Sequence, residues 1–167
     1  MTEGSRVLVA LRVPVTAARA FDAFTAEIGQ WWQPNGLFQF TAGRTGTLAF
    51  EPGPAGRLVE TYPDGSVFVI GHIRDWDPPH RLVLSWRHAS FSADQETELH
   101  VRFDEIRDGR AGGVTQTRVT VEHFGWDRIP PEHAARHGFP LATFQQRFAQ
   151  WWQTLLRSLG GVAGGGL

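Results

Sequence analysis

The chain has 167 residues, 41% of them hydrophobic, and such a length and composition fit one globular domain. With 16 Lys plus Arg against 17 Asp plus Glu, the formal net charge of −1 gives no long-range field to gather phosphates, so we expect neither nucleic acid nor membrane as a partner. Cysteine is absent, which excludes disulfides, thiolate nucleophiles and sulfur-ligated metals and agrees with a cytoplasmic protein.

The first predicted elements are a strand and an aromatic helix. We expect neither a secretion signal before them nor a bilayer-spanning stretch in the chain. Alternation over residues 7–13 predicts the strand, and Pro14 ends it. Thr16 suits a helix N-cap, and apolar residues at spacings of three and four then form one face of a helix that reaches the first tryptophan pair: Phe21, Phe24 and Ile28.

Six strand-like runs bounded by turn residues occupy the middle of the chain. Asp64-Gly65 and Asp108-Gly109 are turn dipeptides, and Asp77-Pro78-Pro79 forces an extended break. We therefore expect an antiparallel meander. Its strands are predicted at residues 47–51, 57–62, 67–76, 81–88, 97–106 and 115–124.

A long amphipathic helix is predicted over residues 141–159, with a continuous apolar stripe along one face. Glycines from Gly160 onward end it, so we divide the chain into one domain, residues 1–160, and a Gly-rich tail, residues 161–167. The order of strand, helix, six strands and long helix indicates an α+β fold.

Alternation places several candidate side chains on the inner face of the sheet. Trp86 and His88 share a face in one strand, as do Val121 and His123 in the last. In the second strand of the meander Glu60 has two interpretations. It is either inward, with a raised pKa and an acid, base or hydrogen-bonding role, or outward and solvated. A further inward set is Val67, Val69, Gly71 and Ile73.

Two identical Gln-Trp-Trp-Gln stretches bracket the predicted sheet, one at Trp31 and Trp32 and one at Trp151 and Trp152. Neighbouring residues on a helix diverge by about a hundred degrees, so one tryptophan of a pair can face a cavity while the other packs elsewhere. We place Trp152 on the cavity side. Ordinary core filling is an equally good interpretation for each tryptophan. A turn-rich segment after the first pair carries two more rings, Phe38 and Phe40, which are costly to expose unless they fold over something apolar.

Several stretches carry a family resemblance. Residues 71–86, two strand-like runs joined by Asp77-Pro78-Pro79, resemble the strand, Pro-turn, strand signature of the family related to the activator of the heat-shock protein 90 ATPase. Residues 28–32, 57–60 and 117–126 and the final aromatic helix are also similar, so the resemblance spans nearly the whole chain. It implies the helix-grip, START-like fold of the SRPBCC superfamily, in which a curved antiparallel sheet wraps the long C-terminal helix and encloses a cavity.

The resemblance does not fix the function, because this fold hosts lipid carriers, hormone receptors and polyketide cyclases. The eukaryotic activator has an additional N-terminal domain that supplies much of its chaperone contact, whereas this chain starts at the first strand of the helix-grip domain. We therefore do not favour the chaperone as a partner. A homodimer is the other partner that we leave open.

Three functions follow. The favoured one is binding of a small apolar or aromatic molecule, without a cofactor, between the sheet and the last helix. The second is a cofactor-free cyclase, dehydratase or hydrolase that uses His123 and Glu60 as acid and base. The third is a chaperone-linked interaction module that acts through the outer surface. The predicted ligand-binding residues are Trp31, Trp32, Phe38, Phe40, Glu60, Trp86, His88, Val121, His123, Phe144, Phe148 and Trp152.

His123 itself has two interpretations, a buried neutral histidine with a local partner or a polar anchor for the ligand. His133 and His137 are four residues apart, but no third ligand is positioned by the sequence, so we predict two exposed histidines on a short helix and no metal site. The chain has neither a Gly-rich phosphate loop nor a serine elbow, and we assign no catalytic residue.

Overall fold

The computed structural model describes residues 5–107 and 115–165, and the predicted Asp108-Gly109 turn lies outside them. Seven strands, three α-helices and two 3₁₀ helices form in this part of the chain. In order they are β1 (Arg6–Val13), α1 (Ala17–Ala26), α2 (Ile28–Trp31), β2 (Thr47–Phe50), β3 (Arg57–Thr61), β4 (Val67–Asp77), β5 (Arg81–Trp86), β6 (Thr97–Ile106), β7 (Gln116–Phe124), η1 (Trp126–Arg128), η2 (Ala134–Arg136) and α3 (Leu141–Gly164).

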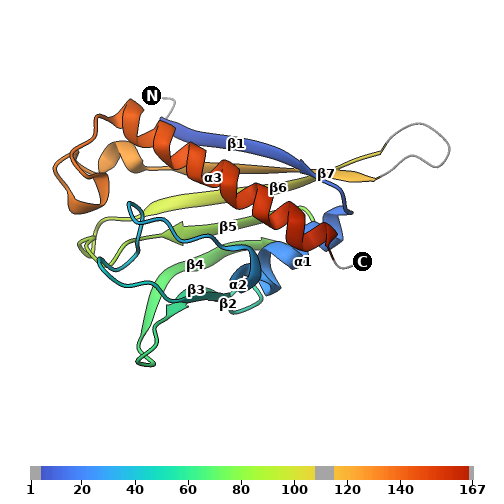
Figure 1. Ribbon diagram of the computed structural model, residues 1–167, viewed down its shortest axis with the longest axis horizontal. Helices are drawn as coiled ribbons and strands as arrows, with labels where there is room; N and C mark the ends of the chain where they lie inside the picture. The colour runs from blue at the N-terminus through green and yellow to red at the C-terminus, as the bar shows by residue number, and fades with distance from the viewer. Residues whose placement is uncertain (1–4, 108–114, 166–167) are drawn as a thin grey trace.

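One curled antiparallel sheet contains all seven of these strands in the order β1-β7-β6-β5-β4-β3-β2. The meander from β2 to β7 is as predicted, and β1 completes the sheet by pairing with β7. Helix α3 runs diagonally across one face, and the segment after α2 lies over the same face beside it (Figure 1). This arrangement confirms the predicted α+β helix-grip fold.

The N-terminal helix begins and packs as its sequence predicts. The Thr16 hydroxyl accepts a hydrogen bond from the Arg19 amide at 3.1 Å, which caps α1. Phe21 and Phe24 on its apolar face are buried. The helix divides at Glu27, and the short α2 then carries the chain to the first tryptophan pair.

Strand β4 corrects one predicted face. Val67 is 53% exposed, whereas its neighbour Phe68 packs against the core, so the inward assignment of Val67 and Val69 is wrong. The pairing of β3 with β4 shifts register, and one extra residue there reverses the alternation before Gly71. Gly71 and Ile73 keep the predicted inward face.

Helix α3 continues to Gly164, five residues beyond the predicted end, so the proposed tail begins inside the helix. Gly160 lies against Val13, and Gly164 lies so close to Pro14 that a side chain there would be crowded. Ala163 is buried, and its carbonyl accepts a hydrogen bond from Arg19 Nε at 3.3 Å. Packing onto β1 and α1 thus outweighs the cost of glycine in a helix, about 1 kcal/mol per residue.

Large aromatic side chains fill the space between the sheet and α3. None of the helices in the described ranges is long and apolar enough to cross a membrane. The interior side chains come from every part of the chain, and those at most 2% exposed include Phe24, Trp31, Phe38, Trp86, Trp126, Phe144, Phe148 and Trp152. These rings form the setting of the candidate site.

Candidate functional site

The two tryptophan pairs meet between α2 and α3. The ring centroid of Trp32 lies 5.1 Å from that of Trp151 and 5.9 Å from that of Trp152. Trp31 and Trp152 are fully buried. Trp31 Nε1 donates to a backbone carbonyl of α1, and Trp151 Nε1 donates to the carbonyl of Gln33 at 2.8 Å. One tryptophan of each pair is therefore tied to the backbone, and Trp32 and Trp152 face each other across the interior.

The segment of residues 33–46 adds two phenylalanines to this interior. Phe38 packs against Phe148 on α3, with ring centroids 5.0 Å apart, and Phe40 packs against Trp86 on β5 at 5.2 Å. Both phenylalanines are buried. The segment has no helix or strand of its own. Its position therefore depends on these ring contacts and on a few hydrogen bonds.

His123 lies at the centre of the ring cluster and is fully buried. Its ring centroid is 5.3 Å from that of Trp86, and its Nε2 is 2.7 Å from the hydroxyl oxygen of Thr97. Burial, and secondarily the charges of His88 and His100, hold its pKa well below the usual histidine range, so the imidazole is neutral. Thr97 has one hydroxyl proton, so its contacts with the Trp86 carbonyl at 3.3 Å and with Nε2 of His123 are both hydrogen bonds in the tautomer in which Nε2 donates, and we assign that tautomer, which leaves Nδ1 as an acceptor.

Buried nitrogens without a hydrogen-bond partner concentrate in this cluster. The ring of His123 lies 5.5 Å from that of Trp126, and Trp86 lies 6.4 Å from Trp152. Buried polar groups are paired in the great majority of cases, so several unpaired ones in one place require an explanation. Among the described residues the unpartnered buried side-chain atoms are Nε1 of Trp86, Trp126 and Trp152, Nε2 of His88, Nδ1 of His123 and Nε of Arg136.

Glu60 takes the inward orientation of the two that the sequence allowed, and it anchors residues 33–46. Its Oε1 accepts a hydrogen bond from Tyr62 at 2.6 Å, and its Oε2 accepts one from the Gly46 amide at 3.0 Å. The Tyr62 hydroxyl oxygen also lies 2.7 Å from that of Thr41. Burial, reinforced by the bond to Glu60, raises the pKa of Tyr62 to about 12. Both carboxylate oxygens are thus engaged, one by Tyr62 directly after β3 and one by Gly46 at the end of the segment, and none of the described hydrogen bonds joins Glu60 to His123.

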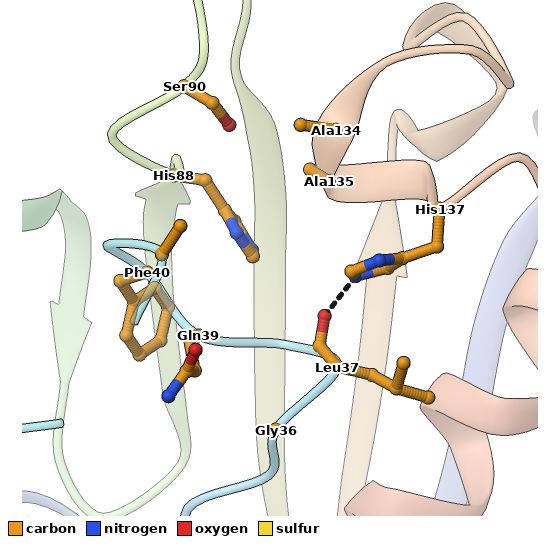
Figure 2. Close-up of a pocket in the computed structure, with 10 residues that line it drawn as sticks. Gly36, Leu37, Gln39, Phe40, His88, Ser90, Ala134, Ala135 and His137 are labelled. Carbon is orange, nitrogen blue, oxygen red and sulfur yellow. Dashed lines mark hydrogen bonds between the residues drawn. The ribbon is translucent and has the colours of Figure 1, made fainter. Parts of the chain in front are cut away.

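A recess of about 400 Å³ lies outside Phe38 and Trp151, between residues 33–38 and α3, and two smaller hollows also border the cluster. One of about 100 Å³ lies between residues 36–42, His88 and η2 (Figure 2). The other, of about 10 Å³, lies beneath Trp32, Phe40 and Glu60. His123 and Trp152 line neither of them. The space that the resemblance assigns to a ligand is therefore occupied by the protein's own rings.

The two histidines before α3 have structural partners. His133 Nδ1 accepts a hydrogen bond from the Ala135 amide at 3.1 Å and so caps η2, while His137 Nε2 bonds to the carbonyl of Leu37. His137 is exposed and His133 half-buried. No group of three or more His, Asp or Glu side chains within the described residues is placed to hold a metal ion.

The structure brings most of the predicted site residues into one network of ring contacts. Val121 is buried on β7 in register with Val101 and Val9, and Glu60 anchors the segment at the edge of the cluster. The connected rings are Trp31, Trp32, Phe38, Phe40, Trp86, His88, His123, Phe144, Phe148 and Trp152.

Sequence reasoning missed Trp126, which is fully buried and packs against His88, His123 and Phe144. It follows Gly125, whose φ of 104° turns the chain back over the sheet after β7. The sequence pattern that could have predicted this buried tryptophan is a glycine followed by a tryptophan directly after a predicted strand.

Comparison with known proteins supports the fold. Residues 14–164 match the family described as Activator of Hsp90 ATPase homolog 1-like protein. Among curated proteins, none matches this sequence. Protein MLL2253 from Mesorhizobium loti is 14% identical, with 98% of this chain and 99% of that chain covered and a TM-score of 0.64.

Two further solved structures carry the family's name or activity in their descriptions. The Aha1 dimer from Colwellia psychrerythraea is 13% identical over 95% of this chain and 96% of that one, with a TM-score of 0.59. PFC0360w, an HSP90 activator from Plasmodium falciparum, is 16% identical over 96% and 97%, with a TM-score of 0.57. At these identities the likeness is one of fold, whereas the family match itself covers most of the sequence. The chain belongs to the family of activator of Hsp90 ATPase homolog 1-like proteins.

Proposed function

We propose that the protein binds a small, largely apolar or aromatic molecule between the sheet and α3. The observation that carries the proposal is the group of interior nitrogens without partners on Trp86, His123, Trp126 and Trp152. Each such group costs about 1 to 3 kcal/mol when it stays unpaired. A ligand with matching polar atoms would recover this energy, while its rings would pack against the surrounding aromatics.

The types of nitrogen indicate the chemistry of the ligand. Indole nitrogens only donate, so Trp86, Trp126 and Trp152 would face carbonyl or other acceptor oxygens. His123 Nδ1 accepts, so it would face a hydroxyl group. A flat or alicyclic skeleton with carbonyl and hydroxyl groups satisfies both requirements, which favours oxygenated aromatics and steroids over simple hydrocarbons.

Entry of such a ligand requires residues 33–46 to move, since Phe38 and Phe40 occupy part of the interior. The segment is held by hydrogen bonds at its two ends and its middle. Ala89 donates to the Phe40 carbonyl at 2.7 Å, Trp151 Nε1 donates to the Gln33 carbonyl, and the Gly46 amide donates to Glu60. Ligand affinity is reduced by the fraction of molecules in which the segment is closed.

A thermal shift assay against lipids, steroids and aromatic polyketides tests the proposal. At a ligand concentration ten times Kd, binding adds about 1.4 kcal/mol, which corresponds to a rise in Tm of about 3 to 6 °C for a domain of this size. His123→Phe keeps the ring and removes the acceptor, and should weaken binding about tenfold.

The matched control for His123→Phe is His100→Phe, because His100 points to the outer face of β6. This control should bind the ligand as the unchanged protein does. Absence of stabilisation by every compound in the panel would contradict the proposal, as would equal affinities of the two histidine variants.

Membership of the family supports a second candidate, contact with the Hsp90 chaperone through the outer surface. The Plasmodium falciparum neighbour is described as an HSP90 activator. A pull-down with Hsp90, combined with an assay of its ATPase, separates this function from ligand binding. Retention with ATPase stimulation would support the candidate, and absence of both would remove it.

A further inference from the structure

The hollow shown in Figure 2 has an exposed rim and a buried floor. Residues 36–42 form one side and η2 with its flanking residues forms the other. Ser90 and His137 at the rim are exposed, while Phe40, His88 and Ala135 below them are buried. Four lining side chains are polar: Ser90 and His137 are exposed at the rim, Gln39 is half-buried, and His88 is the buried one, at the bottom.

The ring of His88 is fixed in orientation. Its centroid lies 5.4 Å from that of Phe40 and 5.4 Å from that of Phe91, with which it stacks. Its Nε2 is buried without a hydrogen-bond partner. The ring tip points into the hollow, between Phe40 and Ala135 (Figure 2). A polar atom that is both unpaired and directed into a recess is available to a ligand.

The unpaired Nε2 is a hydrogen-bond acceptor. Burial lowers the pKa of His88 to about 4, although a hydrogen bond to the Gln39 backbone acts in the opposite direction, so the imidazole is neutral near pH 7. A backbone bond that raises a histidine pKa is one in which the imidazole donates. Because Nε2 is without a hydrogen-bond partner, the nitrogen that donates to the backbone is Nδ1, and Nε2 carries the lone pair.

The size of the hollow limits its ligand to one ring. A closed apolar cavity of about 150 Å³ holds benzene. This hollow measures about 100 Å³ and is open at its rim, so it takes at most one ring, with part of that ring outside the recess. Apolar walls from Leu37, Phe40 and Ala135 suit an aromatic ring, and the acceptor at the bottom requires a donor on that ring. We propose that this hollow is a binding site for phenols, whose hydroxyl group donates a hydrogen bond to Nε2 of His88. The site is separate from the interior one, because His123 and Trp152 do not line it.

Phenol and anisole are the probes that test this site, because anisole has the same ring and cannot donate a hydrogen bond. Binding is followed by the ¹⁵N chemical shift of His88 Nε2 in the full chain, which reports on the acceptor directly. Phenol should bind at least about tenfold more tightly than anisole and should move the Nε2 resonance, whereas anisole should leave it in place.

Two variants assign the preference to a residue. His88→Phe keeps the stacking with Phe91 and removes the acceptor, so phenol and anisole should bind it equally. His123→Phe should keep the preference for phenol. Equal binding of the two probes to the unchanged protein, no saturable shift of the His88 resonance, or a preference that survives in His88→Phe would each overturn the proposal. Loss of the preference in His123→Phe alone would place phenol in the interior and would overturn the separate site while leaving the proposed interior function intact.

Discussion

Replacing Trp152 by alanine is expected to lower the free energy of unfolding by about 3 to 5 kcal/mol. Trp152 is fully buried on α3, and its ring lies 5.9 Å from Trp32, 6.4 Å from Phe24 and 6.4 Å from Trp86. Neighbours that belong to α1, the residue after α2, and β5 cannot all move in to close the gap, so most of a cavity would remain. Urea denaturation followed by far-ultraviolet circular dichroism measures the change.

The matched control is Gln153→Ala, one residue along the same helix and exposed to solvent. It should change the free energy of unfolding by no more than about 0.5 kcal/mol. The cavity in Trp152→Ala is of a size and polarity that added indole can fill, so indole should raise the Tm of this variant and leave that of Gln153→Ala unchanged. A loss of stability below about 1 kcal/mol would show that the interior is loosely packed and would contradict the structure.

The secondary structure could be predicted largely from the sequence because its determinants are local. Turn dipeptides and the Asp77-Pro78-Pro79 break set most strand limits closely, and the limits of β6 agree with the predicted range. The Thr16 cap and the apolar stripe of α3 are likewise patterns within single elements. Short connections between successive strands set the antiparallel order from β2 to β7. Among the described strands, β1 and β7 are the one pair whose members lie far apart in the sequence.

The errors arise where distant residues decide the outcome. The extra residue in β4 depends on how β3 pairs with it, and no local pattern marks it. The helix extends through Gly160 and Gly164 because β1 and the start of α1 cover its last turns. The inward orientation of Glu60 depends on Tyr62 and Gly46, whose approach requires the folded β2 and β3.

The candidate site was predictable as a cluster but not as a space. Aromatic side chains at inward positions had to meet between the sheet and α3, and they do. Whether they leave a cavity depends on how Phe38, Phe40 and Trp126 fit among the other rings. Shifts of a fraction of an ångström in these side chains decide that fit, and a sequence pattern does not specify them. The unpartnered nitrogens are equally invisible in a sequence, since a hydrogen-bond partner is a property of the folded neighbourhood.

Raising the pH from 10 to 12 is expected to lower the free energy of unfolding by about 2 kcal/mol through Tyr62 alone. The folded-state pKa of Tyr62 is raised to about 12 from its ordinary value of 10.0, chiefly by burial and then by the bond to Glu60. Between these two values the unfolded chain loses the proton while the folded chain keeps it, so each pH unit favours unfolding by at most about 1.4 kcal/mol. Well below pH 10 both states are protonated and the contribution is constant.

This chain isolates the effect, because Tyr62 is its single tyrosine and it contains no lysine. Urea denaturation at several pH values gives the slope, and the ultraviolet absorbance of the phenolate gives the pKa directly. In urea-unfolded protein the phenol should titrate near pH 10, and Tyr62→Phe should abolish the slope. A phenolate that forms near pH 10 in the folded protein would contradict the burial of the Tyr62–Glu60 pair. Tyr62 and Glu60 together hold residues 33–46 through Thr41 and Gly46. Deprotonation of Tyr62 should therefore also release the segment that covers the proposed ligand site.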